Sequence, residues 1–459
     1  MQLLFSNLRG RRMAHQEDGD RHSQRPRLMV AHFMLGNTYP FTEKDWLATF
    51  DLASEAGLDG FALNLGPEEW QFSQALMAYD LLSSHSSGLK LFLSLDMNVN
   101  PSATSTDGDL LAEKVLRVLS EPAQLKWDGR PVLSSFSGHA VSFGGEGWKG
   151  WLNRLNARSE TPVFFWPTFF MPPKEFIDLP YVDGTFAWNA AWSVGSLSDS
   201  WAQLINRPAG NHTISLEEDA PFLASDKPYM ASASPLFFTH YGKTGQWAWD
   251  KNWIYRSDDL LYPTRLAELI SLPTHQSPSI IQIISWNDYG ESHYLSPILG
   301  AQPGSDHWTQ NMSHIAFREM THFFSLLWKG VPEIEAIGND PRVYMWYRTH
   351  PSSIIVKDDE VGLPRNSEWA QDLINLFILL PPSTLEHKIV VKNEDKVHER
   401  SLKTGKPNLF TVGFKPGKVT FELVAGSAVL VAGEGKRILD EGEIEGYNYN
   451  MWSGSWRGD

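Results

Sequence analysis

The chain has 459 residues, of which 42% are hydrophobic and 20% are charged, and these proportions exclude an intrinsically disordered protein. The formal net charge of −15 and the lack of a basic cluster argue against nucleic acid and against a membrane surface as partners. The chain contains no cysteine, so disulfides, thiolate catalysis and cysteine-bound zinc are excluded.

Aromatic residues make up 12% of the chain and include 19 tryptophans. Tryptophan and tyrosine combine a flat apolar face with a polar group, which suits the apolar C–H faces of sugar rings. The alternative is that a large barrel and a sandwich simply use many aromatic residues in their cores. With the negative charge, this composition favours a neutral or poorly charged substrate.

Residues 1–26 are polar and charged and predict a disordered N-terminal tail. The tail lacks the apolar segment of a secretory signal peptide, and no run of 18 apolar residues occurs in the chain. We therefore expect the chain as given to be intracellular, or to be expressed without its secretion signal.

From residue 27 onward, apolar runs alternate with amphipathic stretches, which predict buried parallel strands and the helices between them. The predicted strands are 28–35, 60–65, 90–97, 131–136, 162–169, 181–188, 228–234 and 279–286. The predicted helices are 45–56, 71–85, 109–120, 146–156, 198–205, 258–269 and 312–328, and a long aromatic insertion covers 235–255.

These eight strand–helix units predict a (β/α)8 barrel, which would be a catalytic domain over residues 27–335. A doubly wound open sheet is the alternative architecture. No G-x-G-x-x-G or Walker motif follows any predicted strand, so a nucleotide cofactor has no support.

Beyond residue 335 the pattern changes to short β-type runs separated by Gly, Pro, Asn and Asp turn signals. The runs are 342–347, 354–356, 373–380, 387–391, 418–423 and 428–431. Their spacing predicts an antiparallel β-sandwich accessory domain over residues 336–459. Such a domain either binds a polymer or covers the flank of the barrel, and both roles stay open.

Acidic side chains follow two of the predicted strands at the end where barrel enzymes carry their active sites. Asp288 and Glu291 come after the last strand, in the stretch SIIQIISWNDYGESHY at 279–294, and Asp96 ends the third. Two carboxylates flanking a glycosidic bond are the usual requirement for its hydrolysis. The alternatives are helix N-capping for Asp288 and Glu291, and the orientation of a catalytic partner for Asp96.

The other predicted strand ends supply amides, hydroxyls, imidazoles and indoles, which hydrogen-bond to sugar hydroxyls and stack on sugar rings. The predicted substrate-binding residues are His32, Asn37, Asn64, Trp166, Trp188, Asn189, His240, Tyr241, Trp286, Asn287, Tyr289 and His293. For His32, which lies inside an apolar strand, a buried core histidine is the alternative. No H-E-x-x-H or comparable spacing supports a metal site, and no G-x-S-x-G motif supports a serine hydrolase.

Four segments of the predicted barrel carry a resemblance to a known family. They are AHFMLGNTYPFTEKDW at 31–46, GLDGFALNLG at 57–66, KLFLSLDMN at 90–98 and SWNDYGESHYL at 285–295. In this order they resemble the fungal α-1,3-glucanases, or mutanases, of glycoside hydrolase family 71. The resemblance implies hydrolysis of fungal cell-wall α-1,3-glucan with inversion at the anomeric carbon and no cofactor. The family's candidate acids match Asp288, Glu291 and Asp96.

The resulting hypothesis has Glu291 as the preferred proton donor and Asp288 activating a water, with the reverse assignment as the alternative. Inversion requires about 6.5–9.5 Å between the two carboxyls, so they would have to point to opposite sides of the cleft. Asp96 would hold the water or tune the pKa of a partner. A retaining glycosidase on another glucan and a non-catalytic glucan-binding protein are the competing readings. We expect a monomer.

Overall fold

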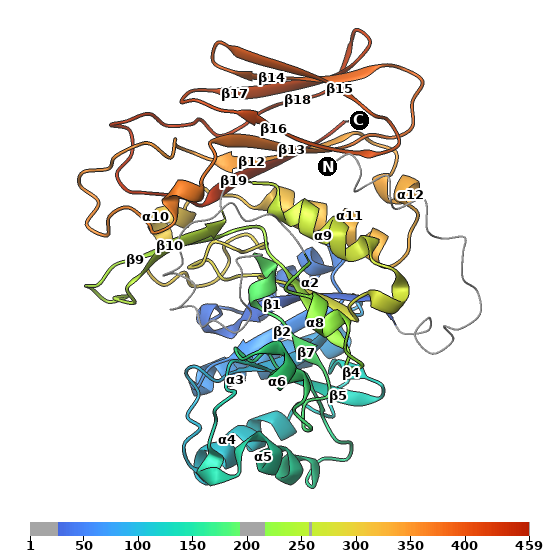
Figure 1. The fold of residues 1–459 in the computed structure, drawn as a ribbon, viewed down its shortest axis with the longest axis vertical. Helices are drawn as coiled ribbons and strands as arrows, with labels where there is room; N and C mark the ends of the chain where they lie inside the picture. The colour runs from blue at the N-terminus through green and yellow to red at the C-terminus, as the bar shows by residue number, and fades with distance from the viewer. Residues whose placement is uncertain (1–25, 193–215, 257–258, 459) are drawn as a thin grey trace.

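A parallel β-sheet forms the centre of the first part of the chain (Figure 1). The computed structural model describes residues 26–192, 216–256 and 259–458, so the predicted tail (apart from residue 26) and the predicted helix at 198–205 lie outside the described residues. The parallel strands are β1 (Leu28–Met34), β2 (Gly60–Leu65), β3 (Lys90–Asp96), β5 (Arg130–Phe136), β6 (Phe164–Phe165), β7 (Thr185–Phe186), β8 (Tyr229–Ala233) and β11 (Ile280–Ile283). They are ordered β5-β3-β2-β1-β11-β8-β7, with β6 also paired to β5 and the short β4 (Lys126–Trp127) antiparallel to β5.

Each predicted strand of the barrel region overlaps one observed strand, but β6 and β7 are only two residues long. The predictions 162–169 and 181–188 were therefore too long. Pro162 and Pro167 have no N–H to donate to a neighbouring strand, which limits regular pairing around β6. Before β7, Gly184 packs so closely on Trp166 that an added Cβ would lie 2.8 Å from the indole ring.

Helices follow most of these strands. The longer ones are α2 (Glu43–Glu55), α3 (Glu69–Ser84), α4 (Ser105–Leu116), α5 (Gly147–Asn156), α9 (Leu261–Ser271) and α11 (Ile315–Trp328). The shorter ones are α6 (Pro173–Ile177), α8 (Ala220–Leu223), α10 (Asp306–Thr309) and α12 (Glu333–Ile337). The starts of α2 and α4 follow from the sequence, because Thr42 with Asp45 and Thr104 with Asp107 form capping boxes. Within the described residues, no helix is both long enough and apolar enough to cross a membrane.

The two faces of the parallel sheet differ, because successive strand residues point to opposite sides. One face packs against the helices in a large apolar cluster, to which β1 contributes Met29, Ala31 and Phe33. The other face, called the inner face here, carries a second apolar cluster near the starts of the strands, including Val30, Ala62, Phe92, Val132 and Ile280. The same alternation places polar residues on the inner face further along the strands, namely His32, Asn64, Asp96 and Gln282.

A two-stranded hairpin follows β8. Its strands are β9 (Phe237–Tyr241) and β10 (Lys251–Arg256), and they pair with Lys251 opposite Tyr241 and Asn252 opposite His240. This hairpin is the structure adopted by the predicted aromatic insertion.

The C-terminal part contains two four-stranded antiparallel sheets, drawn at the top of Figure 1. One has the order β16-β13-β12-β19 and the other β15-β14-β17-β18. The strands are β12 (Arg342–Arg348), β13 (Leu373–Leu379), β14 (His387–Asn393), β15 (Lys396–Leu402), β16 (Pro407–Gly413), β17 (Val419–Ala425), β18 (Ala428–Glu434) and β19 (Met451–Arg457). A third apolar cluster draws residues from both sheets, and the first sheet also packs on α11 through Trp346 and Phe317.

Sequence reasoning was wrong on several C-terminal strands. Residues 354–356 are not a strand, whereas β15, β16 and β19 were not predicted. β15 is mostly exposed and polar, and β19 has three glycine or serine residues between its tryptophans, so neither shows the apolar run that was used to find strands. Backbone pairing with β14 and β12 produces them instead.

Candidate active site

The candidate site is built on the loop that leaves β11. The N–H of Trp286 donates to the carbonyl of His32 at 2.7 Å, which attaches the loop to the end of β1. The loop also closes on itself, because the Ser285 N–H donates to the His293 carbonyl at 2.6 Å and the Leu295 N–H donates to the Ser285 carbonyl at 3.1 Å. These backbone bonds hold the side chains between Ser285 and His293 at the C-terminal end of a buried strand.

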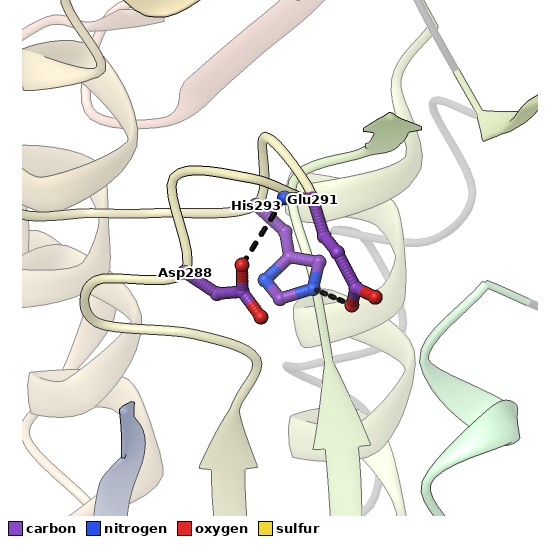
Figure 2. Close-up of side chains that lie close together, drawn as sticks. All are labelled: Asp288, Glu291 and His293. Carbon is purple, nitrogen blue, oxygen red and sulfur yellow. Dashed lines mark hydrogen bonds and ion pairs between the residues drawn. The ribbon is translucent and has the colours of Figure 1, made fainter. Parts of the chain in front are cut away.

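A chain of hydrogen bonds runs through this loop to the carboxylate of Glu291, and Figure 2 shows its last bond, between His293 and Glu291. The Asp288 N–H donates to Ser285 Oγ at 2.8 Å, and Ser285 Oγ lies 3.0 Å from His293 Nδ1. His293 Nε2 lies 3.0 Å from Glu291 Oε2 and donates this bond, because an ionised carboxylate only accepts. In the neutral ring, the Ser285 hydroxyl then donates to Nδ1.

The β9–β10 hairpin contributes a cation to the same carboxylate. Lys251 Nζ, at the start of β10, lies 3.5 Å from Glu291 Oε1. The backbone of β9 is attached to the loop as well, since the Phe238 N–H donates to the Glu291 carbonyl at 3.2 Å. Glu291 is therefore contacted by a histidine of its own loop and by a lysine of a neighbouring hairpin.

The surroundings of Asp288 and Glu291 move their pKa values in opposite directions. Burial raises the pKa of Asp288, and the negative charge of Glu291 raises it further. Burial also opposes ionisation of Glu291, but the Lys251 ammonium and the hydrogen bond from His293 outweigh it and hold the Glu291 pKa well below its ordinary value. A pair of carboxyls with such divergent pKa values suits a proton donor beside an ionised partner.

Asp96 is a third acid with an altered pKa. Burial raises its pKa to about 6, against the hydrogen bonds from the Asn98 N–H and the Asn64 side chain, which favour the ionised form. Glu291 also raises it by charge repulsion, whereas Lys251 lowers it. Asp96 thus belongs electrostatically to the same site, although it comes from β3 rather than from the β11 loop.

Asp288, Glu291 and His293 are tightly grouped. An oxygen of each carboxylate and a nitrogen of the imidazole all lie within 4.8 Å of one another. This separation is shorter than the spacing of about 6.5–9.5 Å that the sequence hypothesis required of Asp288 and Glu291 as an inverting pair. Among the described residues, this group is the one that could hold a metal ion, but the Lys251 ammonium already supplies positive charge at Glu291.

His32 is a buried inner-face residue of β1, and its carbonyl accepts from the loop at Trp286. Its Nδ1 accepts from the amide of Gln282 at 3.1 Å, and its ring meets Trp188 edge-on with a centroid distance of 4.7 Å. Burial lowers the pKa of His32 to about 3, so the ring is neutral at ordinary pH. Trp188 and Asn189, just after β7, are also almost fully buried.

Several predicted substrate-binding residues instead form the frame of the site. Trp166 and Trp286 are completely buried, and the Trp166 indole donates to the Thr185 carbonyl at 2.8 Å. Tyr289 is buried too and donates to the Pro297 carbonyl. Core packing covers the faces of these three rings in this structure.

Asn287 and Asn37 bind backbone groups. The Asn287 amide accepts from the Met34 N–H at 2.7 Å and donates to the Met34 carbonyl at 3.1 Å, while Asn37 donates to the Asn287 carbonyl at 2.8 Å. These bonds fix the β11 loop against the end of β1.

His240 and Tyr241, on β9, are likewise engaged by protein groups. His240 pairs with Asp359, and the Tyr241 hydroxyl donates to the Pro303 carbonyl at 2.8 Å.

Sequence reasoning missed Ser285, Gln282 and Lys251. Ser285 and Gln282 lie within the stretch that it singled out, and strand alternation from Ile280 would have put Gln282 on the inner face. Lys251 had no such signal, because it lies in an insertion whose hairpin only the folded structure reveals.

Comparison with known proteins places the chain in a family. A sequence model described as glycosyl hydrolase family 71 matches residues 25–459. The glucan endo-1,3-α-glucosidase agn1 of Schizosaccharomyces pombe is 31% identical over 435 residues, covering 93% of this chain and 94% of that protein. A mutanase of Penicillium rubens is 27% identical over 438 residues, covering 94% of this chain and 89% of that protein.

Among solved structures, a GH99 endo-α-mannosidase described as from "Bacteriodes thetaiotaomicron" has a TM-score of 0.47 and 11% identity, over 66% of this chain and 98% of that one. The family match spans all of the described residues, including the β11 loop and β3, which carry the three acids. The chain is a member of glycosyl hydrolase family 71.

Proposed function

We propose that this protein is a glycoside hydrolase that cleaves α-1,3-glucosidic bonds of α-1,3-glucan. Its family membership and the names of its relatives, a glucan endo-1,3-α-glucosidase and a mutanase, support this substrate. The net charge of −15 is compatible with an uncharged polysaccharide.

One observation carries the assignment of an enzyme rather than a binding protein. Glu291 is held between Lys251 and His293, which favour its ionised form, while Asp288 and Asp96 have raised pKa values. A binding surface has no need for one ionised carboxylate beside two acids that retain protons, whereas glycoside hydrolysis needs both states at once.

For the mechanism we propose that Glu291 is the base that activates water. This reverses the role preferred from the sequence, because Lys251 and His293 keep Glu291 ionised. Asp96 is then the proton donor, since its raised pKa keeps it protonated up to about pH 6. Asp288 orients the loop by accepting the Glu291 N–H at 3.1 Å, and its raised pKa favours its neutral form beside the ionised Glu291.

The placement of the strands supports this pairing of acids. β3 is separated from β11 by β2 and β1, which amounts to three strand intervals of about 4.8 Å each along the sheet. Asp96 therefore reaches the substrate from a different side than Glu291, leaving room for the water of an inverting reaction. If Asp288 and Glu291 act as the pair instead, their close approach favours retention.

Of the predicted sugar contacts, we propose Asn64, Trp188 and Asn189 as those nearest the reacting bond, while the buried His293 holds Glu291. His32, Asn37, Asn287 and the buried aromatic residues support them from behind. His240 and Tyr241 lie on β9 and contribute by holding the β9–β10 hairpin in place.

We also propose that the parallel sheet closes into a (β/α)8 barrel over residues 27–335. The Phe186 N–H donates to the Pro167 carbonyl at 3.1 Å and the Asp183 N–H to the Phe165 carbonyl at 3.0 Å, which supports closure between β7 and β6. The shared apolar cluster of the two C-terminal sheets supports a β-sandwich over 336–459. We propose that the protein acts as a monomer.

The test is a time course with purified protein on insoluble α-1,3-glucan, read by the lengths of the released oligosaccharides. We expect reducing oligosaccharides from this glucan and none from a β-1,3-glucan. Release of no reducing ends from either polymer would show a binding protein instead, and cleavage of the β-linked polymer alone would indicate a different glucanase.

The mechanism is tested by proton NMR of the first-formed product. Inversion of an α-linkage yields the β-anomer first, and retention yields the α-anomer. An Asp96→Asn variant should keep activity on a 2,4-dinitrophenyl α-1,3-gluco-oligosaccharide, because this leaving group needs no protonation. If the α-anomer forms first, the reaction proceeds with retention, and the partner of Glu291 is Asp288 rather than Asp96.

A further inference from the structure

The β9–β10 hairpin, which delivers Lys251 to Glu291, is fastened to a segment of the C-terminal part. This segment, the Asp359 loop, comprises residues 353–366 between β12 and β13. The Arg365 N–H donates to the Asn252 carbonyl at 3.1 Å, and the Ile254 N–H donates to the Arg365 carbonyl at 3.0 Å. The Asp359 loop therefore adds backbone hydrogen bonds along β10, directly after Lys251.

A buried ion pair strengthens this attachment. His240 Nε2 on β9 lies 2.9 Å from Asp359 Oδ2, and the two side chains are only 7% and 4% exposed. The Nδ1 of the same ring lies 2.8 Å from Asn252 Oδ1 on β10. His240 thus connects both strands of the hairpin to the Asp359 loop.

The orientation of the Asn252 amide determines which of its atoms faces the His240 ring. The orientation of the Asn252 amide is set by its Nδ2, which donates to the carbonyls of Val361 at 3.3 Å and Gly362 at 3.0 Å. Oδ1 of Asn252 therefore faces the ring, and this oxygen can only accept, as can the Asp359 carboxylate. An oxygen of Asn252 and an oxygen of Asp359 thus contact the two nitrogens of the His240 ring and hold it from both sides.

Asp359 is itself held firmly by its own loop. Its Oδ1 accepts from the N–H groups of Val361 and Gly362 at 2.9 and 3.0 Å, and its Oδ2 also accepts from the Tyr447 N–H at 2.7 Å. Burial opposes ionisation, but the bonds from His240 and the Tyr447 N–H outweigh it and lower the pKa of Asp359 to about 2. The carboxylate is a fixed anchor that the hairpin binds, because three backbone N–H groups hold its position.

We propose that Asp359 and His240 are positioning residues for the reaction: their ion pair fixes the β9–β10 hairpin so that Lys251 stays against Glu291. The inference rests on the proposed function, in which ionised Glu291 is the base. It makes the C-terminal part of the chain a component of the active site. Positioning the hairpin is a third role for the C-terminal part, in addition to polymer binding and covering the flank of the barrel, which the sequence left open.

The consequence is measurable at Glu291. Without the ion pair the hairpin moves more freely, Lys251 spends less time at Glu291, and the base becomes easier to protonate. Because the active form is ionised Glu291, the acidic limb of the pH–rate profile moves to higher pH. The titratable groups whose charges act on Glu291, or on which it acts, are Lys251, His293, Asp288, Asp96, His32, Tyr241 and Tyr255.

The experiment is a double-mutant cycle on the full chain with Asp359→Asn and Lys251→Met. Each single variant should lower kcat on α-1,3-glucan about 10- to 100-fold with little change in KM, and should move the acidic limb upward. The double variant should be no worse than Lys251→Met alone, because both substitutions remove the same contact. The proposal would be overturned if the kcat decreases of the two single variants multiplied in the double variant. A wild-type pH–rate profile in Asp359→Asn would overturn it as well.

Asp372→Asn is the matched control. Asp372 lies in the same connection between β12 and β13 and pairs with Arg348 and Ser352. This variant should lower the Tm, because it removes the partner of the buried Arg348, and should leave the pH–rate profile unchanged. A shifted acidic limb in Asp372→Asn as well would reduce the role of Asp359 to general stability and overturn the proposal.

A readout without substrate separates this proposal from the proposed function. The rate at which acetic anhydride acetylates Lys251, followed by peptide mass spectrometry, should rise at least several-fold in Asp359→Asn and stay at the wild-type value in Asp372→Asn. An unchanged Lys251 rate overturns the positioning role even if the enzyme is active. A wild-type chain that cleaves no α-1,3-glucan while the Lys251 rate rises in Asp359→Asn overturns the proposed function alone.

Discussion

His293 Nε2 lies 3.0 Å from Oε2 of Glu291, while Nδ1 of the same ring lies 3.0 Å from the Ser285 hydroxyl. The imidazole is completely buried, so it cannot turn away from the carboxylate without breaking both bonds. This fixed ring and the Lys251 ammonium determine which acid of the site is ionised. The predictions below follow from that arrangement and from the packing around it.

Replacing Glu291 by glutamine should remove the proposed base. We expect kcat on α-1,3-glucan to fall by about 10²- to 10⁴-fold. The Tm should change little, because the amide oxygen can still accept from His293. Initial rates and thermal unfolding measure the two effects. Glu160→Gln, at an exposed position, is the matched control and should behave as wild type. Wild-type turnover in Glu291→Gln would show that the base is elsewhere.

Replacing Ser285 by alanine should loosen His293. The hydroxyl is buried between the Asp288 N–H and His293 Nδ1, so its loss removes the group that orients the ring. We expect kcat to fall by roughly 10-fold, in line with other residues that orient a catalytic partner. Steady-state kinetics measure this, with Ser73→Ala on the exposed side of α3 as control. Equal kinetics in both variants would mean that the ring needs no such support.

Asp96 should make activity and stability pH-dependent. Activity should decline as pH rises through about 6, because the proposed donor loses its proton there. The folded pKa is raised above the ordinary value of 3.8, so the folded state binds the proton more tightly and stability falls as pH rises between these values. Two pKa units correspond to about 3 kcal/mol in the free energy of unfolding.

The stability effect of Asp96 can be isolated by urea unfolding of wild type and Asp96→Asn at several pH values. Residue 96 does not titrate in the asparagine variant. The free energy of unfolding of the variant minus that of wild type should therefore increase between pH 4 and about pH 6 and stay constant at higher pH. A constant difference across this range would show that the Asp96 pKa is not raised in the folded protein.

Trp346 should be needed for the stability of both parts of the chain. It lies on β12, is 1% exposed, and its indole donates to the Asp259 carbonyl at 3.0 Å. Replacement by alanine should cost about 3–5 kcal/mol in the free energy of unfolding. Trp249→Ala, at a position that is 45% exposed, should cost under about 1 kcal/mol. Similar losses of free energy of unfolding in both variants, measured with denaturant, would contradict the role of Trp346 in joining the two parts of the chain.

Local patterns in the sequence were sufficient for much of the fold. Runs such as 60–65 and 90–97 were correctly predicted as strands, because a strand buried on both faces is continuously apolar whatever surrounds it. The helices were predicted from residues 45 and 109, whereas α2 and α4 begin earlier, at Glu43 and Ser105, directly after the capping residues Thr42 and Thr104. The same reasoning overextended β6 and β7, where prolines and close packing limit pairing.

The acids of the site, Asp96, Asp288 and Glu291, were recognised in the sequence because each follows a buried strand. The sequence did not reveal the protonation states of these acids. Those states, and the roles proposed for Glu291 and Asp288, depend in part on neighbours distant in the chain. Lys251 reaches Glu291 across 40 residues, and Asp359 reaches His240 across 119. Residue types and their order thus determined which chemistry is present. Only the tertiary structure decided which carboxylate is charged, because a pKa depends on burial and on charges brought close by folding.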